Sequence, residues 1–155
     1  MIRLTKLTDY GIVLMSHLAA EPDSLMTASS LALETQISMP TVAKILKVLA
    51  REQLLASYRG ANGGYVLDRD PRDISVADVI AAMEGPIAVT ECSELGPGEC
   101  AQESVCRVRT NWQMINDVVR DALASISLAQ MAQPWSLPLG SSAPALIQIG
   151  STSPQ

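Results

Sequence analysis

"ISMPTVAKILKVLAREQLLASYRGANGGYVLDRDP", residues 37–71, joins a helical pattern to a glycine-rich hairpin pattern. Apolar residues recur every three or four positions in its first half, at Val42, Ile45, Leu46 and Leu49. Ser38 is placed to cap this helix, and Pro40 falls in its first turn, where the missing N–H of proline costs nothing. The first half therefore predicts a helix with one buried stripe and a polar, basic opposite face.

The second half of this stretch predicts two short strands, at 57–59 and 65–67. The turn between them, residues 60–64, is rich in glycine, and we expect it to need positive φ angles. We expect Tyr58 and Tyr65 to pack at the base of this hairpin. A helix followed by a two-stranded wing is the order of a winged helix-turn-helix.

The flanking sequence supplies the other helices of such a domain. The first helix has Thr8 and Asp9 as N-cap candidates and stops at Pro22, and its apolar face includes His17, which we expect to be a core residue. Residues 27–35 predict a short second helix. Ser75 and Asp78 are spaced as a capping box, which predicts a further helix over 75–84.

Charge is unevenly distributed along the chain. The net charge of −5 argues against a nucleic-acid partner, but residues 39–65 carry Lys44, Lys47, Arg51 and Arg59 against Glu52 alone, a local net charge of +3. A basic helix face next to a wing suits double-stranded DNA.

A recognition helix reads bases with its N-terminal residues, and its later residues contact the DNA backbone. We therefore predict the DNA-binding residues Ser38, Met39, Pro40, Thr41 and Lys44, with Lys47 and Arg51 toward the backbone and Arg59 at the wing tip. An arginine at a glycine-rich tip can enter a narrow minor groove. The alternatives are a plain solvated helix face and a winged domain that binds protein.

All three cysteines lie in one acidic, glycine-broken stretch, at Cys92, Cys100 and Cys106. Neither gap is the two-residue spacing of zinc knuckles, whereas thiolates on a loosely spaced loop are the usual anchors of an iron–sulfur cluster. Three thiolates leave one ligand missing. The alternatives are a redox-active thiol trio without metal and three small buried side chains.

An apolar a/d repeat with a mean spacing of 3.5 follows the cysteines, at Val105, Val108, Trp112, Ile115, Val119, Ala122 and Ile126. It predicts a long dimerisation helix over 103–132, although such a helix could also pack on its own domain. Residues 133–155 are rich in Pro, Ser and Gly and read as a flexible tail.

Several classes of protein are disfavoured by the composition. No apolar run approaches the roughly 18 residues needed to cross a bilayer, and the N-terminus does not resemble a signal peptide, so we expect a cytoplasmic protein without a membrane partner. No nucleophile–base pair, phosphate loop or paired carboxylates are recognisable, so neither enzymatic activity nor a small-molecule substrate is expected.

The chain resembles the Rrf2 family of winged-helix regulators, and in particular its IscR-like and NsrR-like members. The resemblance rests on "LTKLTDYGIVLMSHLA", "SMPTVAKILKVLAREQLL", "SYRGANGGYVLDRDPRDISVADVIAAMEGP", "TECS" and "CRVRTNWQMINDVVRDALASISLAQM", and covers roughly residues 1–132. Within the family, the chain looks most like regulators of the SUF iron–sulfur assembly operon. The resemblance implies a mainly α homodimer with a crossed dimer helix, an iron–sulfur cluster and repression controlled by cluster occupancy.

Carried over by position, Cys92, Cys100 and Cys106 are the thiolate ligands. IscR-like members have a histidine three residues after the last cysteine, where this chain has Arg109. NsrR-like members use an aspartate at the start of the first helix, supplied by the other chain, and Asp9 matches that position. The cluster type, 2Fe–2S or 4Fe–4S, is left open.

The sequence thus predicts four segments: a DNA-binding domain (1–86), a cluster-binding loop (87–102), a dimerisation helix (103–132) and a tail (133–155). The predicted function is a DNA-binding repressor that senses iron–sulfur status and controls cluster-assembly genes. The alternatives are a metal-free thiol redox regulator on the same scaffold, and an iron–sulfur carrier or electron-transfer protein whose winged domain binds protein.

Overall fold

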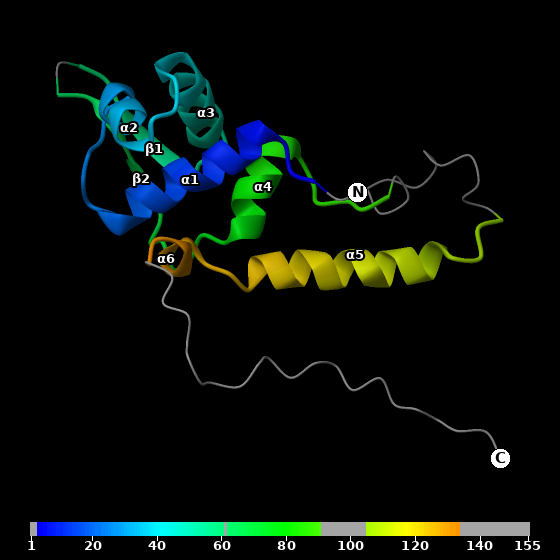
Figure 1. Cartoon of the computed structure of the whole chain (residues 1–155). Coiled ribbons are helices and arrows are strands. Elements are labelled where there is room, and N and C mark those ends of the chain that lie inside the picture. The colour runs from blue at the N-terminus through cyan, green and yellow to red at the C-terminus, as the bar shows by residue number, and fades with distance from the viewer. Residues whose placement is uncertain (1–2, 61, 91–104, 134–155) are drawn as a thin grey trace.

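The computed structural model describes residues 3–60, 62–90 and 105–133, and it is mainly helical, as predicted. The elements in chain order are α1 (Lys6–Ala20), α2 (Ala28–Thr35), α3 (Met39–Arg51), β1 (Leu55–Tyr58), β2 (Gly64–Leu67), α4 (Val76–Glu84), α5 (Arg109–Ala124) and α6 (Leu128–Met131). Figure 1 shows α4 between the helices of the N-terminal domain and the long helix α5. None of the helices described here is long and apolar enough to cross a membrane.

The start of α1 differs from the sequence prediction. Thr5 is the N-cap, and its hydroxyl accepts a hydrogen bond from the Thr8 N–H at 3.2 Å. Thr8, one of the two predicted caps, is instead fully buried inside the helix, and Asp9 is an exposed acid in the first turn. The prediction was wrong because the end of α4, 76 residues away, holds this turn through Glu84.

Helices α2 and α3 form the helix-turn-helix. The prediction of a short helix over 27–35 is confirmed, and Thr27 caps α2 with a full capping box. The turn to α3 passes through Gln36, which adopts the left-handed conformation with φ 57°. Ser38 is the N-cap residue of α3, but its hydroxyl makes no capping bond and lies 2.7 Å from the hydroxyl of Thr41.

The wing is an antiparallel hairpin that pairs Leu55 with Leu67 at its base and Tyr58 with Gly64 near its tip. Among the three described glycines of the turn, only Gly60 has a positive φ, at 118°. Gly63 is needed for a different reason: the two sides of the wing approach each other so closely there that a Cβ would lie 2.3 Å from the carbonyl oxygen of Tyr58. The expectation that this turn needs positive φ is therefore confirmed at Gly60, whereas Gly63 and Gly64 have no positive φ.

Aliphatic side chains from α1, α2, α3, α4, the wing and α6 share one core. Its fully buried large members include Leu14, Met15, Leu31, Ile45, Leu46, Leu49, Ile74 and Leu128. The predicted capping box at Ser75 and Asp78 is present at the start of α4, and Gly85, with φ 92°, ends that helix. The core thus fixes the helix-turn-helix and the wing to α4.

The prediction of one continuous helix over 103–132 is wrong, because the helix begins later and is broken before its predicted end. Residues 105–108 form turns, α5 ends at Ala124, and a new capping box at Ser127 starts the four-residue helix α6. The reason is tertiary: Leu128 is fully buried in the core of the N-terminal domain, so the chain must turn back toward it.

Helix α5 packs mainly on α4, and most of its surface is exposed in the single chain. Trp112 and Ile115 of the predicted a/d repeat are 36% and 41% exposed. Asn116 is the one residue of α5 that is buried, at 5% exposed. The apolar repeat therefore lies outside the described core.

Candidate nucleic-acid interface and cysteine segment

The predicted DNA-reading residues lie together at the start of α3. Ser38, Met39 and Pro40 are exposed, and Thr41 is half-buried beside Ser38. Lys44 and Lys47 are exposed on the following turns, whereas the apolar stripe of α3 is buried. The fold therefore presents the short and basic side chains of α3 outward, as base reading and phosphate contact by such a helix require.

Arg51, at the end of α3, differs from the two lysines because it already has a partner. Its Nε donates a hydrogen bond to Glu52 Oε1 at 3.0 Å, and both side chains are exposed. A neighbouring carboxylate offsets part of the positive charge that a phosphate would meet. We therefore expect Arg51 to attract a DNA phosphate less strongly than Lys44 and Lys47 do.

The wing presents Arg59 as an exposed cation at the end of β1. Tyr58 beside it is 59% exposed, so the expectation that it packs at the wing base was wrong, whereas Tyr65 is half-buried against the core. Tyr58 is thus an exposed side chain beside Arg59 that was not among the predicted DNA-contacting residues. The alternation of side chains along β1 was its only signal, since Tyr58 and the buried Leu55 lie three residues apart on opposite faces.

Cys106 is a free, half-buried cysteine in the turn that leads into α5. Cys92 and Cys100 lie outside the described residues, so their geometry with Cys106 stays a prediction. Within residues 3–60, 62–90 and 105–133, no group of three His, Cys, Asp or Glu side chains is close enough to hold a metal ion. Cysteine thiolates are the donors that iron–sulfur clusters take, usually four to a cluster, so three cysteines leave one ligand position to another group.

Asp9 and His17 both lie on α1, but their environments differ. Asp9 is exposed in the first turn of that helix. His17 is not a core residue as predicted: its side chain is 36% exposed, and its Nε2 lies 2.6 Å from Glu34 Oε2 on α2. His17 thus ties α1 to the helix-turn-helix.

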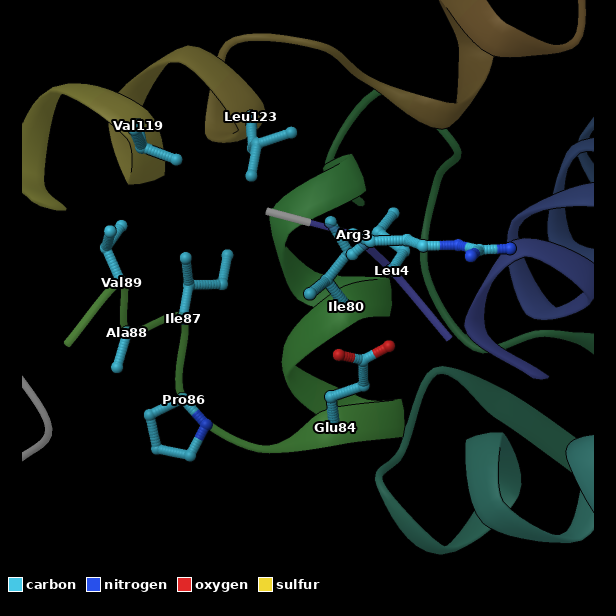
Figure 2. A pocket seen from close by; sticks show the side chains of 10 residues that line it. All are labelled: Arg3, Leu4, Ile80, Glu84, Pro86, Ile87, Ala88, Val89, Val119 and Leu123. Carbon is cyan, nitrogen blue, oxygen red and sulfur yellow. The ribbon is translucent and has the colours of Figure 1, made fainter. Parts of the chain in front are cut away.

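The segment that leads from α4 toward the cysteines is attached to α5. Asn116 Oδ1 accepts a hydrogen bond from the Val89 N–H at 2.9 Å. A cavity of about 330 Å³ lies beside this contact, and Figure 2 shows Ile87 and Val89 on one wall facing Val119 and Leu123 of α5. Asn116 falls inside the predicted dimerisation helix, and no signal in the sequence marked it as a functional residue.

Glu84 lines the same cavity, on the side that faces α1. Its Oε1 accepts hydrogen bonds from the Thr8 hydroxyl at 2.5 Å and from the Thr5 N–H at 2.8 Å. These bonds, first that from Thr8 and then that from Thr5, lower the pKa of Glu84 because they favour the charged carboxylate. The carboxylate therefore joins the end of α4 to the start of α1.

Comparison with known proteins agrees with this architecture. The protein rrf2 of Nitratidesulfovibrio vulgaris (strain Hildenborough) is 30% identical over 137 residues, which are 88% of this chain and 91% of that protein. The structure of CymR, described as the global cysteine regulator of B. subtilis, matches with a TM-score of 0.67 at 28% identity, over 85% of this chain and 97% of that one. IscR from T. potens matches with a TM-score of 0.61 at 30% identity, over 84% of this chain and 85% of that one.

Residues 4–134 match the Rrf2 family, which is described as an iron-dependent transcriptional regulator. This match covers the helix-turn-helix, the wing, α4, the cysteine segment, α5 and α6. The transcriptional regulators of this family bind DNA and are not enzymes. The chain, with its winged helix, belongs to the Rrf2 family of transcriptional regulators.

Proposed function

We propose that this chain is a homodimeric repressor that senses an iron–sulfur cluster and controls iron–sulfur assembly genes, such as a SUF operon. Cys92, Cys100 and Cys106 would hold the cluster, whose chemistry is reversible electron transfer and loss on oxidation. The observation that carries the proposal is the place of Cys106. It lies in the turn directly before α5, the helix with the exposed apolar repeat.

The dimer is supported by the surface of α5. Trp112 and Ile115 are large apolar side chains that no part of the described chain covers fully, and they lie on the predicted a/d seam. A second α5 packed along this seam would bury them and gain free energy from the apolar area removed from water. The distance between the two recognition helices then depends on how the two α5 helices cross.

DNA sets a strict requirement on that distance, because half-sites in successive major grooves lie about 34 Å apart. A change at the cysteine segment reaches α5 through Cys106 and so bears on the crossing of the dimer helices. Loss of the cluster would shift the dimer between a tight-binding and a weak-binding population. The exposed Asp9 is proposed as the fourth ligand, supplied by the partner subunit.

Anaerobic purification tests this function directly. We expect a brown protein with iron and sulfide in proportion to chains, and a promoter-fragment affinity that changes when the iron is removed. Cys106→Ser should abolish iron retention. Asp9→Ala should alter the Mössbauer spectrum, while the matched control Asp23→Ala, at another exposed acid, should not. A colourless wild-type protein free of iron would exclude a cluster sensor.

A second candidate is a metal-free thiol regulator on the same scaffold. The likeness to CymR, described as a global cysteine regulator, favours it. Such a protein would be iron-free after anaerobic purification, and its DNA affinity would change when the thiols are oxidised and return when they are reduced. The iron and sulfide count therefore separates the two candidates.

A further inference from the structure

Asn116 is the buried polar residue of an otherwise exposed helix, and its partner is unusual. Its Oδ1 accepts the N–H of Val89, which lies 27 residues earlier and three residues before Cys92. An amide oxygen buried to 5% exposure is costly unless it keeps a hydrogen bond. The Val89–Asn116 bond is therefore a specific link between α5 and the chain that enters the cysteine segment.

The C-terminal end of α5 is held far more firmly than the rest of the helix. The Val76 N–H donates to the Ile126 carbonyl at 2.9 Å, and the Leu128 N–H donates to the Ile74 carbonyl at 2.8 Å. Leu128 then enters the core, where it is fully buried. This end cannot move relative to the DNA-binding domain without breaking that bridge and opening the core.

Between this anchor and the cysteines, α5 packs loosely. One cavity of about 330 Å³ separates Val119 and Leu123 from the segment at Ile87 and Val89, as Figure 2 shows. A second cavity of about 340 Å³, lined in part by Asn116, lies between α5 and the outer side of α4. Apolar contacts interrupted by cavities on two sides do not fix a helix angle as a close-packed interface would.

We propose that Asn116 is a positioning residue that transmits the state of the cysteine segment to the angle of α5. This inference rests on the proposed function. Both ends of the cysteine segment are then joined to α5, one through the Val89–Asn116 bond and the other through the turn from Cys106 to Arg109.

Because its C-terminal end is held by the Val76–Ile126 and Ile74–Leu128 hydrogen bonds, α5 can change its angle only by rotating about that end. Asn116 lies eight residues before Ala124, the last residue of α5, about 12 Å along the helix, and Arg109 lies about 22 Å from the same point. A displacement of Val89 relative to α4 rotates the helix about its C-terminal end, and the shift at the cysteine end is about 1.9 times that at Asn116. The crossing of two α5 helices in a dimer changes accordingly.

The test compares DNA affinity with and without the cluster, under anaerobic conditions, on a promoter fragment of an iron–sulfur assembly operon. Asn116→Leu keeps the side-chain volume and removes the acceptor, and Asn116→Ala serves if the leucine variant does not fold. Asn116→Asp keeps an acceptor oxygen, with Arg120 lining the same cavity. Asn111→Ala is the matched control, since Asn111 is exposed on the same helix.

The quantity measured is the ratio of the DNA affinity with the cluster to the DNA affinity without it. In Asn116→Leu we expect this ratio to be closer to one than in wild type by about fivefold or more, with the iron content unchanged. Asn116→Asp and Asn111→Ala should keep the wild-type ratio. A wild-type ratio in both acceptor-free variants would overturn the inference and leave the proposed function standing. Loss of iron from those variants would overturn it too, because Asn116 would then only support the cysteine segment. A wild-type protein without a cluster response would overturn the proposed function itself.

Discussion

The carboxylate of Glu84, the last residue of α4, accepts a hydrogen bond from the hydroxyl of Thr8, which lies 76 residues earlier in the first turns of α1. The same carboxylate oxygen accepts the N–H of Thr5. One exposed acid thus holds the start of the first helix against the helix that leads to the cysteine segment.

The link between Glu84 and Thr8 makes part of the stability depend on pH. Because the hydrogen bonds lower the pKa of Glu84 below its ordinary value of 4.5, their contribution is fully present above about pH 4.5. It is lost as pH falls through the lowered pKa. Glu84→Ala should reduce the free energy of unfolding by about 1 kcal/mol at pH 7, a small effect because the group is exposed.

Urea denaturation of wild type and Glu84→Ala at pH 7 and pH 3 measures this contribution. The difference between the two proteins should shrink at the lower pH. Glu84→Gln keeps an acceptor but no charge, so its difference from wild type should also shrink there. An equal difference at both pH values would show that the carboxylate charge is not involved.

The wing should not tolerate a side chain at Gly63. A Cβ there would lie 2.3 Å from the Tyr58 carbonyl oxygen, so Gly63→Ala must open the turn that presents Arg59. We expect Gly63→Ala to bind the promoter fragment more weakly. Its helical circular dichroism should be unchanged, because the tip of the wing lies outside the hydrophobic core. Asn62→Ala, at the adjacent exposed residue, is the control. Wild-type affinity in Gly63→Ala would mean that the wing does not touch DNA.

Lys44 and Arg59 should each contribute through phosphate or groove contacts that depend on salt. Lys44→Ala should weaken binding and reduce the slope of log affinity against log salt by about one, and Arg59→Ala should act in the same way. Arg72→Ala is a matched control, since Arg72 is paired with Asp70 in the loop beside α6. A double variant that binds no worse than this control would favour a protein partner for the winged domain.

Arg51 offers an internal comparison with Lys44. Its guanidinium is already hydrogen-bonded to Glu52, so Arg51→Ala should weaken DNA binding less than Lys44→Ala does. Fluorescence anisotropy on the same fragment measures both. Glu52→Ala should raise affinity slightly, and unchanged affinity in that variant would show that the ion pair does not restrain Arg51.

The apolar seam of α5 should govern the oligomeric state. Ile115→Glu places a charge on a side chain that is 41% exposed in the single chain, so the domain should still fold. We expect its mass in solution, measured by light scattering, to fall from that of a dimer to that of a monomer. Thr110→Glu, at an exposed position on the far side of the repeat, should remain dimeric. A dimeric Ile115→Glu protein would place the interface elsewhere.

Leu128 is a core residue of the N-terminal domain although it follows α5 in the sequence. Leu128→Ala should lower the free energy of unfolding by about 2–5 kcal/mol, because it leaves a cavity in a fully buried site. Met131→Ala, exposed in the same short helix, should change it far less. Similar losses in both variants would contradict the anchoring of α6.

The sequence alone determined the elements whose signals are local. The stripe of α3, the caps at Thr27 and Ser75, and the wing with its glycines all follow from spacing and turn chemistry within a few residues. The basic face followed as well, because charges on one side of a short amphipathic helix are readable directly. These features sufficed for the winged helix, and they place the predicted DNA-reading residues on an exposed face of α3.

Only the tertiary structure decided the features that depend on distant partners. Thr5 rather than Thr8 caps α1 because Glu84 arrives from α4, and the predicted long helix breaks after Ala124 because Leu128 enters the core. His17 contacts Glu34 rather than the core, and the side chain of Asn116 accepts a hydrogen bond from the N–H of Val89. Spacing reports which side chains share a face of one helix, whereas the partner that each face meets is set by packing between segments far apart in the chain.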